Sequence, residues 1–400
     1  MVRIESKRGM FALMMAHCAG MVDLVALPVW VGTLIAHYHF DPQQAGGLAT
    51  LFLIGAAGAS IFFAPRFNRI HVKFTAVLGF AFAAAAFVLS ASTFSFPILA
   101  VLHFLGGIAA GSALSVTHGT MGHGNNPHRT FGIAGLAIGI FGVIFLGGTP
   151  GIIQQFGGHS MFYVMAGVML LATLACLLFF PKPTRAVDFD NYEQIKNLPP
   201  LGKPVWFCMI GVALLAMTQA MTLSFYERIG LERGFSRDMV TMALIIYGIV
   251  TIFPAPLAAL LEKRVSITAI IAFGPIFQGI FAVMTTHTHQ YSVFAFAGPM
   301  MAFTILFVHT FAFGLLARLD PTGRAVAGTP AMLMVGAAVA PFISGTIVKF
   351  ISFEAIGYAC CIVVAVQVYL FSQTRKAVLA GQTNIPVIAK IKNNETQPVA

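Results

Sequence analysis

Asp23 is the acidic residue that falls in the middle of a long apolar run of this sequence. The other aspartates and glutamates lie in polar breaks, in the chain ends or near the ends of apolar runs, and no lysine or arginine lies mid-run to neutralise Asp23. A charged side chain at the centre of a bilayer costs about 2.5–3.5 kcal/mol by insertion scales, so such groups mark ion or substrate paths. Because an apolar environment disfavours the ionised form, Asp23 is predicted to bind and release a proton as its exposure alternates. The alternative is a protonated carboxylic acid that only holds neighbouring helices together.

His103 stands at the start of the stretch HFLGGIAAG, His103 to Gly111. Its imidazole has a titratable nitrogen without a permanent charge, so His103 is a second candidate for proton coupling. An imidazole that hydrogen-bonds a helix carbonyl would satisfy the same polar group, and the sequence favours neither reading. Gly107, Gly111 and Ser115 recur every four residues, which predicts the close approach of a neighbouring helix.

Several aromatic and polar residues are candidates for lining a substrate cavity: Trp30, Gln219, Phe225, Tyr226 and His309. An interfacial aromatic belt is an equally good explanation for the three aromatic residues. For His309, a hydrogen-bonded histidine inside a helix bundle is the more common role. The segments HYH and HTH contain histidine pairs but lack further ligands nearby, so no metal site and no cofactor are expected.

The elements that carry these residues are predicted to be membrane helices. The chain has 400 residues, of which 58% are hydrophobic and 9% charged, and its mean hydropathy is +0.87. This composition excludes a water-soluble globule. A spanning helix needs about 20 largely apolar residues, and the sequence has twelve such runs. They cover residues 10–36, 44–65, 73–93, 96–118, 130–154, 160–180, 204–226, 238–260, 266–286, 291–316, 326–349 and 353–373.

Lysines and arginines lie mainly in the breaks that are on the same side of the membrane as the two chain ends. Of the 23 basic residues, only four lie in breaks on the opposite side: Arg228, Arg233, Arg237 and Lys349. Cytoplasmic loops retain basic residues, so both termini are expected in the cytoplasm. The net charge of +10 therefore indicates topology and contact with anionic lipid rather than a nucleic-acid partner.

The chain divides into two parts of similar organisation. A polar, proline-rich segment follows the sixth run, and a fixed offset places Gly142 opposite Gly336 and Gly151 opposite Gly345. We therefore expect an N-terminal six-helix bundle over residues 1–180, a cytoplasmic linker over 181–203, a C-terminal six-helix bundle over 204–374 and a cytoplasmic tail over 375–400. Parallel repeats with a binding site between them are typical of transporters.

Three segments resemble patterns of the major facilitator superfamily, and the resemblance extends along essentially the full chain. After the second run that family reads G-x-x-x-D-R-x-G-R-R/K, and PRFNR here keeps Arg66 and Arg69 but has Pro65 and Asn68 for the aspartate and glycine. HFLGGIAAG is similar to a fourth-span pattern that often begins with arginine. GAAVAPFISG, residues 336–345, matches a second-half pattern, whereas the antiporter version in the fifth run lacks its proline at the expected place.

The resemblance implies an all-α membrane fold of two pseudo-symmetric six-helix bundles, with Arg66 and Arg69 in a gating loop. It also implies a monomer in a lipid bilayer, here expected to be a bacterial inner membrane. We expect a secondary active transporter that moves a small organic molecule by alternating access, coupled to protons and directed to efflux. The alternatives are a proton symporter that imports a small metabolite such as an organic acid, and a membrane sensor that has lost transport. No enzyme motif occurs, so an enzyme is not expected.

Overall fold

The computed structural model describes residues 2–181, 200–261, 264–320 and 324–380. Within these ranges it has 12 helical segments that are long and apolar enough to cross a membrane, which confirms the predicted all-α fold. Their bounds are Lys7–Ala36, Pro42–Phe63, Val72–Ala91, Phe96–Gly122, Arg129–Phe156, His159–Phe179, Lys203–Glu232, Arg237–Ala258, Ile267–His287, Tyr291–Leu319, Ala331–Phe350 and Glu354–Leu379. The largest departures are the seventh span, which reaches Glu232, and the twelfth, which reaches Leu379. Most of the predicted linker and tail lies outside the described residues.

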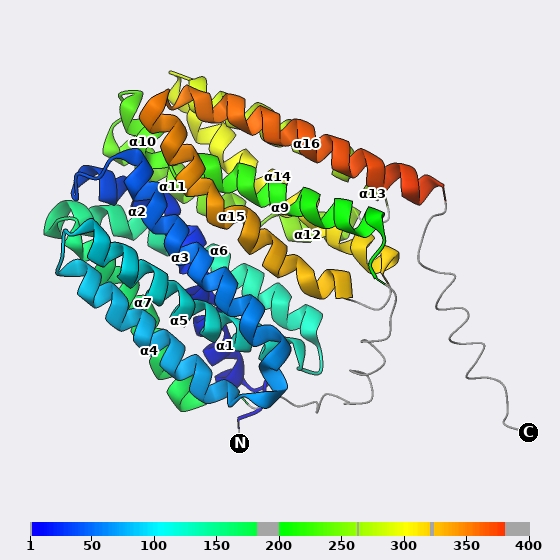
Figure 1. The fold of residues 1–400 in the computed structure, drawn as a ribbon, viewed down its shortest axis with the longest axis horizontal. Helices are drawn as coiled ribbons and strands as arrows, with labels where there is room; N and C mark the ends of the chain where they lie inside the picture. Colours follow the sequence, from blue (N-terminus) through cyan, green and yellow to red (C-terminus); the bar gives the residue numbers. More distant parts are fainter. Residues whose placement is uncertain (1, 182–199, 262–263, 321–323, 381–400) are drawn as a thin grey trace, which may run out of the picture.

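The first six spans form what we call the N half (Figure 1). Its elements are α1 (Lys7–Gly20), α2 (Val22–Ala36), α3 (Pro42–Phe63), the 3-10 helix η1 (Ala64–Arg69), α4 (Val72–Ala91), α5 (Phe96–Gly122), α6 (Pro127–Phe156) and α7 (His159–Phe179). The first span is thus two helices that meet at Met21, whose N–H donates to the carbonyls of Ala19 and His17. The break places Asp23 in the first turn of α2.

The other six spans form the C half. Its elements are α9 (Lys203–Leu223), α10 (Tyr226–Glu232), α11 (Arg237–Val250), α12 (Pro254–Leu261), α13 (Ile267–His287), α14 (Tyr291–Leu319), α15 (Arg324–Phe350) and α16 (Glu354–Leu379). The seventh span is also broken, but near its end, at Ser224 and Phe225. Serine hydroxyls cap helix starts here as elsewhere in proteins; Ser236 Oγ accepts the N–H of Met239 at the start of α11.

The small residues after His103 bring α5 against α3. A Cβ built on Gly107 would lie 2.0 Å from the carbonyl oxygen of Phe52, and one on Gly111 would lie 2.3 Å from that of Ala56. One step further along, Ser115 Oγ donates to the carbonyl of Ser60 at 3.5 Å. Only residues without a bulky side chain permit two helix backbones to approach this closely. The predicted packing role of this ladder is confirmed.

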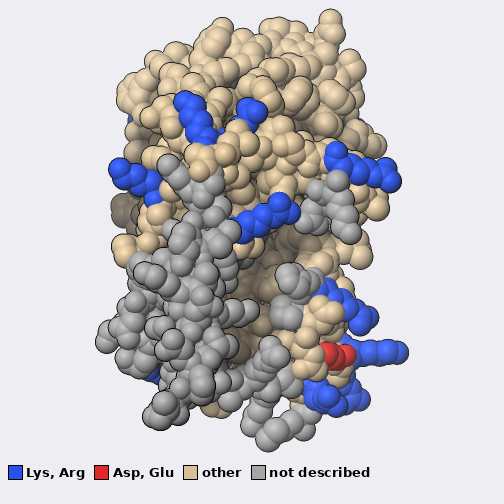
Figure 2. Space-filling view, turned by 90° about the vertical axis from the view of Figure 1, so that its right-hand side faces the viewer, with Lys and Arg blue, Asp and Glu red and all other residues tan. Residues whose placement is uncertain are grey.

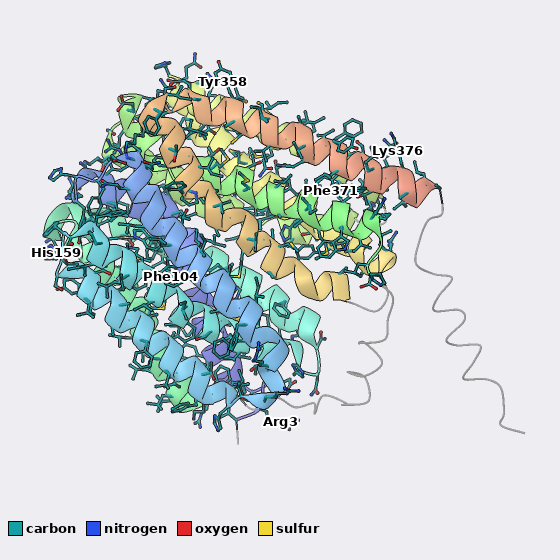
Figure 3. The ribbon with its side chains drawn as sticks, in the orientation of Figure 1. Arg3, Phe104, His159, Tyr358, Phe371 and Lys376 are labelled. Carbon is teal, nitrogen blue, oxygen red and sulfur yellow. The ribbon has the colours of Figure 1, made fainter. Side chains whose placement is uncertain are left out.

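The two ends of the bundle differ in charge. Figure 3 places Arg3 and Lys376 at one end, which we call the terminal face, and His159 and Tyr358 at the other, which we call the far face. Exposed basic residues at the terminal face are Arg3, Lys7, Arg8, Arg66, Arg69, Arg129, Lys203, Arg264, Arg318, Arg375 and Lys376. Between the faces, large apolar side chains such as Ile144, Ile362 and Phe82 are more than half exposed, as suits a surface that contacts acyl chains.

The halves meet at the far face and part at the terminal face. A Cβ on Gly46 of α3 would lie 2.0 Å from the Pro341 carbonyl oxygen of α15, and one on Gly345 would lie 2.2 Å from that of Pro42. Between the described parts of the halves, hydrogen bonds join residues 41–50 to residues 342–349. Figure 2 looks onto the terminal face, where lysine and arginine side chains surround a hollow between the halves. The structure is therefore closed at the far face and open at the terminal face.

Candidate functional site

Asp23 is buried in the interior of the N half, with 1% of its surface exposed. Its Oδ1 accepts the backbone N–H of Leu24 at 2.9 Å, and its Oδ2 is buried without a hydrogen-bond partner. Burial disfavours the carboxylate, whereas the N–H groups of the first turn of a helix favour it. These opposing effects bring the neutral and ionised forms of Asp23 closer in free energy than burial alone would.

His103 and Trp30 lie together inside the N half. Their rings stack with centroids 5.3 Å apart, and Phe162 meets the imidazole edge-on at 5.5 Å. His103 Nδ1 donates to the Leu99 carbonyl at 2.7 Å, and Nε2 is buried without a partner. Trp30 is fully buried and packs on Phe52, so the prediction that it lines the cavity does not match its position. A tryptophan near the outer end of a span can point into its own bundle or toward a cavity between the bundles. The sequence does not show which of these directions its side chain has.

Gln219 and Tyr226 are brought near each other through Tyr247. Gln219 Nε2 donates to Tyr247 Oη, while Gln219 Oε1 is buried without a partner. Tyr226 stacks on Phe294 at 4.3 Å, donates to the Phe294 carbonyl at 3.0 Å and lies 6.3 Å from the Tyr247 ring. These contacts hold α9, α10, α11 and α14 together inside the C half.

The remaining predicted residues are dispersed. Phe225 is fully buried against Phe353, which also differs from the predicted position on a cavity. His309 Nδ1 donates to the Ile305 carbonyl one turn back at 2.9 Å. In η1, Arg66 donates to the Phe62 carbonyl at 2.7 Å and lies over its ring at 3.9 Å, while Arg69 is exposed. Both arginines thus lie on the N half in this open state.

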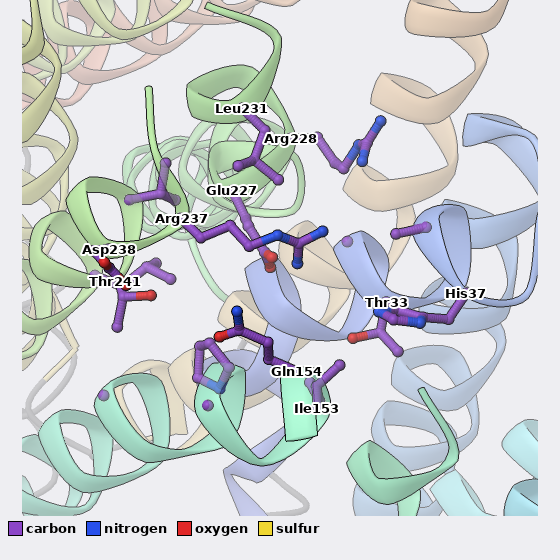
Figure 4. A pocket seen from close by; sticks show the side chains of 17 residues that line it. Thr33, His37, Ile153, Gln154, Glu227, Arg228, Leu231, Arg237, Asp238 and Thr241 are labelled. Carbon is purple, nitrogen blue, oxygen red and sulfur yellow. The ribbon is translucent and has the colours of Figure 1, made fainter. Parts of the chain in front are cut away.

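A cavity of about 210 Å³ lies between the halves near the far face (Figure 4). The N half lines it with the ends of α2 and α6, and the C half with α10 and the start of α11. The polar side chains that line it are Thr33, His37, Gln154, Glu227, Arg228, Arg237, Asp238 and Thr241. At the outer end of the cavity Arg237 and Asp238 are exposed, whereas Thr33 and Glu227 Oε2 deeper in it are buried.

Glu227 and Arg237 point toward each other in this cavity, and the amide of Gln154 points toward both from the N half (Figure 4). Glu227 Oε2 is fully buried without a hydrogen-bond partner, and so is Arg228 Nε. A Cβ on Gly32 of the opposite half would lie 2.6 Å from Glu227 Oε2. Leaving buried charged groups without hydrogen bonds is costly, and Glu227 and Arg237 present both signs of charge to the cavity.

The sequence pattern does not predict this cavity, because Glu227 lies near the end of an apolar run and Arg228 and Arg237 lie in a break between runs. The available signal was a group of five charged residues within Glu227–Arg237, at one end of a span. The folded chain places them against Gly32 and Gln154, which are distant in sequence.

An ion pair and its hydrogen-bonded neighbours cross between the halves at the far face, and we call these residues the far-face latch: Asp41, Gln43, Thr346 and Lys349. Lys349 Nζ donates to Asp41 Oδ2 at 3.0 Å and to Gln43 Oε1 at 3.2 Å, and Gln43 donates to Thr346 Oγ1 at 3.1 Å. Partial burial alone would raise the pKa of Asp41. Hydrogen bonds from the Gln44 N–H and Lys349, with the positive charge of Lys349, outweigh it and lower that pKa.

Replacing Asp41 with asparagine is expected to favour opening of the far face by no more than about fivefold. Both side chains of the pair are 34% exposed, and exposed pairs contribute at most about 1 kcal/mol. Because the pKa of Asp41 is lowered in the latched state, the latch is fully present above the ordinary value of about 4 and is lost as the pH falls through the lowered value.

Distances between spin labels on the far ends of α3 and α15, followed from pH 8 to pH 3, would measure this equilibrium. Lys349→Gln should match the asparagine variant. A transition of the wild-type latch near neutral pH would contradict the assignment.

Comparison with known proteins gives a family and a fold. The family model described as Major Facilitator Superfamily matches residues 12–329. Among curated proteins, none matches. The crystal structure of the nucleoside transporter NupG is similar at a TM-score of 0.71 and 13% identity, covering 93% of this chain and 100% of that one. A mutant of the same transporter gives a TM-score of 0.70 at 13% identity, covering 91% and 99%.

Proposed function

The chain belongs to the major facilitator superfamily, and from that premise we propose that it is a proton-coupled transporter of a small organic molecule that carries no net negative charge. The family identifies a transporter rather than an enzyme. Alternating access would close the hollow at the terminal face and part the halves at the far face.

The observation that carries the proton coupling is the environment of Asp23. The side chain is 1% exposed, and Oδ2 has no protein partner. A neutral carboxylic acid can remain there while the halves rock, and an ionised one can form once water reaches it. His103 fits a packing role better, because its donated bond to Leu99 is the one expected of a histidine that only satisfies a helix carbonyl.

The charge of the substrate follows from the residues that line the path. Within the described spans, lysines and arginines lie at helix ends and not at mid-depth. At mid-depth an organic anion would meet no permanent cation within these spans, so a neutral, zwitterionic or cationic molecule fits better.

Orientation follows from the basic terminal face. Cytoplasmic loops retain lysine and arginine, so we assign the terminal face to the cytoplasm of a bacterial inner membrane. The structure then represents a state open to the cytoplasm. A monomer suffices for this scheme, because each chain contains both halves.

We assign the direction to efflux by proton antiport. One titratable group in the N half can carry a proton inward while the substrate leaves. Import by proton symport is the second candidate, favoured by the similarity of fold to a nucleoside transporter. Nucleosides are neutral, which agrees with the charge argument.

Proton exchange by the purified protein tests the proposal. Small organic compounds, nucleosides included, would be added to the protein in weakly buffered detergent solution containing a pH indicator. Antiport predicts that a substrate displaces protons, and symport predicts that protons are taken up. Proton coupling is wrong if transported compounds leave proton binding unchanged and their transport does not depend on a pH gradient. A chain that transports nothing would instead fit a sensor.

A further inference from the structure

We propose that the cavity near the far face binds a small zwitterion, a molecule with one ammonium and one carboxylate group. The inference deepens the proposed function, and rests on it only in taking this molecule as the transported one. The cavity itself is defined by four helices, two from each half.

The two signs of charge in the cavity come from the C half. Glu227 and Arg228 lie on α10, and Arg237 begins α11. Glu227 and Arg237 line the cavity, and their side chains point toward each other (Figure 4). An ammonium group of a ligand would pair with the Glu227 carboxylate and a carboxylate with the Arg237 guanidinium, and such charge-assisted hydrogen bonds are the strong ones.

A ligand with only one sign of charge fits less well. A simple anion would meet the carboxylate of Glu227, and a simple cation would meet two guanidinium groups. The N half adds only uncharged or weakly basic partners, Thr33, His37 and Gln154. A molecule with both signs can pair with Glu227 and with Arg237 at the same time.

The size of the cavity limits the ligand. Its volume is about 210 Å³. It lies below the range of about 300–1,000 Å³ that drug-sized ligands occupy. Gly32 is required here, because a side chain on it would collide with Glu227. Amino acids and methylated amino acids have both the charges and the size.

Binding to the purified full-length protein in detergent tests the inference without a gradient. The probes are the standard amino acids and glycine betaine, measured by calorimetry. We expect at least one neutral zwitterion to bind. Its analogue without the amino group and its analogue without the carboxylate should each bind about tenfold more weakly or worse. If no probe binds, or if the analogues bind equally well, the inference is overturned.

Two variants test whether the ligand lies in this cavity. Glu227→Gln should shift preference toward the analogue without the amino group, and Arg237→Gln toward the analogue without the carboxylate. Glu232→Gln changes an exposed carboxylate on the same helix and should leave affinity unchanged. If Glu227→Gln does not fold, the Arg237→Gln variant and the binding of the analogues to the wild-type protein still test whether the zwitterion binds in this cavity. Unchanged selectivity in Arg237→Gln would overturn the inference.

The outcome is separable from that of the proposed function. Asp23→Asn lies outside the cavity and should retain zwitterion binding. Proton coupling without zwitterion binding refutes only the inference, whereas zwitterion binding without proton exchange refutes only the coupling.

Discussion

Replacing Asp23 with asparagine is expected to abolish uphill transport while leaving the fold intact. Asparagine has nearly the same shape and can still accept the Leu24 N–H, but it cannot carry a proton. A membrane potential of 100 mV and one pH unit supply about 2.3 and about 1.4 kcal/mol per proton, enough for roughly 500-fold accumulation. The variant should equilibrate its substrate to a ratio near one.

Proteoliposomes with an imposed pH gradient would measure both the steady-state ratio and the rate of substrate exchange at equal concentrations. Exchange should persist in Asp23→Asn, because it needs rocking but no net proton movement. Glu232→Gln makes the same change of carboxyl to amide at an exposed site and should accumulate like the wild type. Uphill transport by Asp23→Asn would show that the proton travels elsewhere.

Replacing Gly46 with alanine is expected to arrest transport by preventing the far face from closing. The added Cβ would lie 2.0 Å from the Pro341 carbonyl oxygen. Because that oxygen is part of a helix backbone, it cannot rotate away as a flexible side chain would. Overpacking of this kind costs about 1–3 kcal/mol or more, which would shift the balance of states roughly 5- to 150-fold toward an open far face.

Gly47→Ala is the matched control. Its Cβ would lie 3.6 Å from the Phe342 ring, an ordinary contact, so transport should persist. Labelling of a cysteine placed at Thr33 in the cavity should become faster in Gly46→Ala than in the wild type and stay unchanged in Gly47→Ala. Equal transport by the two alanine variants would mean that α3 and α15 need not approach this closely during the cycle.

The helices could be predicted from the sequence because membrane spanning is a one-dimensional constraint. A run of apolar residues must be about as long as the bilayer is thick, so the spans follow from composition alone. The ladder of Gly107, Gly111 and Ser115 was equally readable, because a period of four residues marks one face of a helix. Such signals lie within a single element.

The candidate site could be predicted only in part because it depends on which way side chains face. Asp23 was recognisable because an acid is rare at mid-span. Trp30 and Phe225 were expected on a cavity, yet each is buried inside its own half, and membrane helices are too uniformly apolar for a polar face to indicate the difference. Glu227 was overlooked because its significance comes from Gly32 and Gln154, which only the fold places beside it.

The two broken spans interrupt the repeat at different depths. The first breaks at Met21, beside Asp23, and the seventh breaks at Ser224 and Phe225, beside Glu227. If the roles proposed for these acids hold, energy input belongs to the N half and cargo recognition to the C half. Mutations that convert this protein into a passive facilitator should then map to the N half, and mutations that alter its choice of cargo should map to the C half.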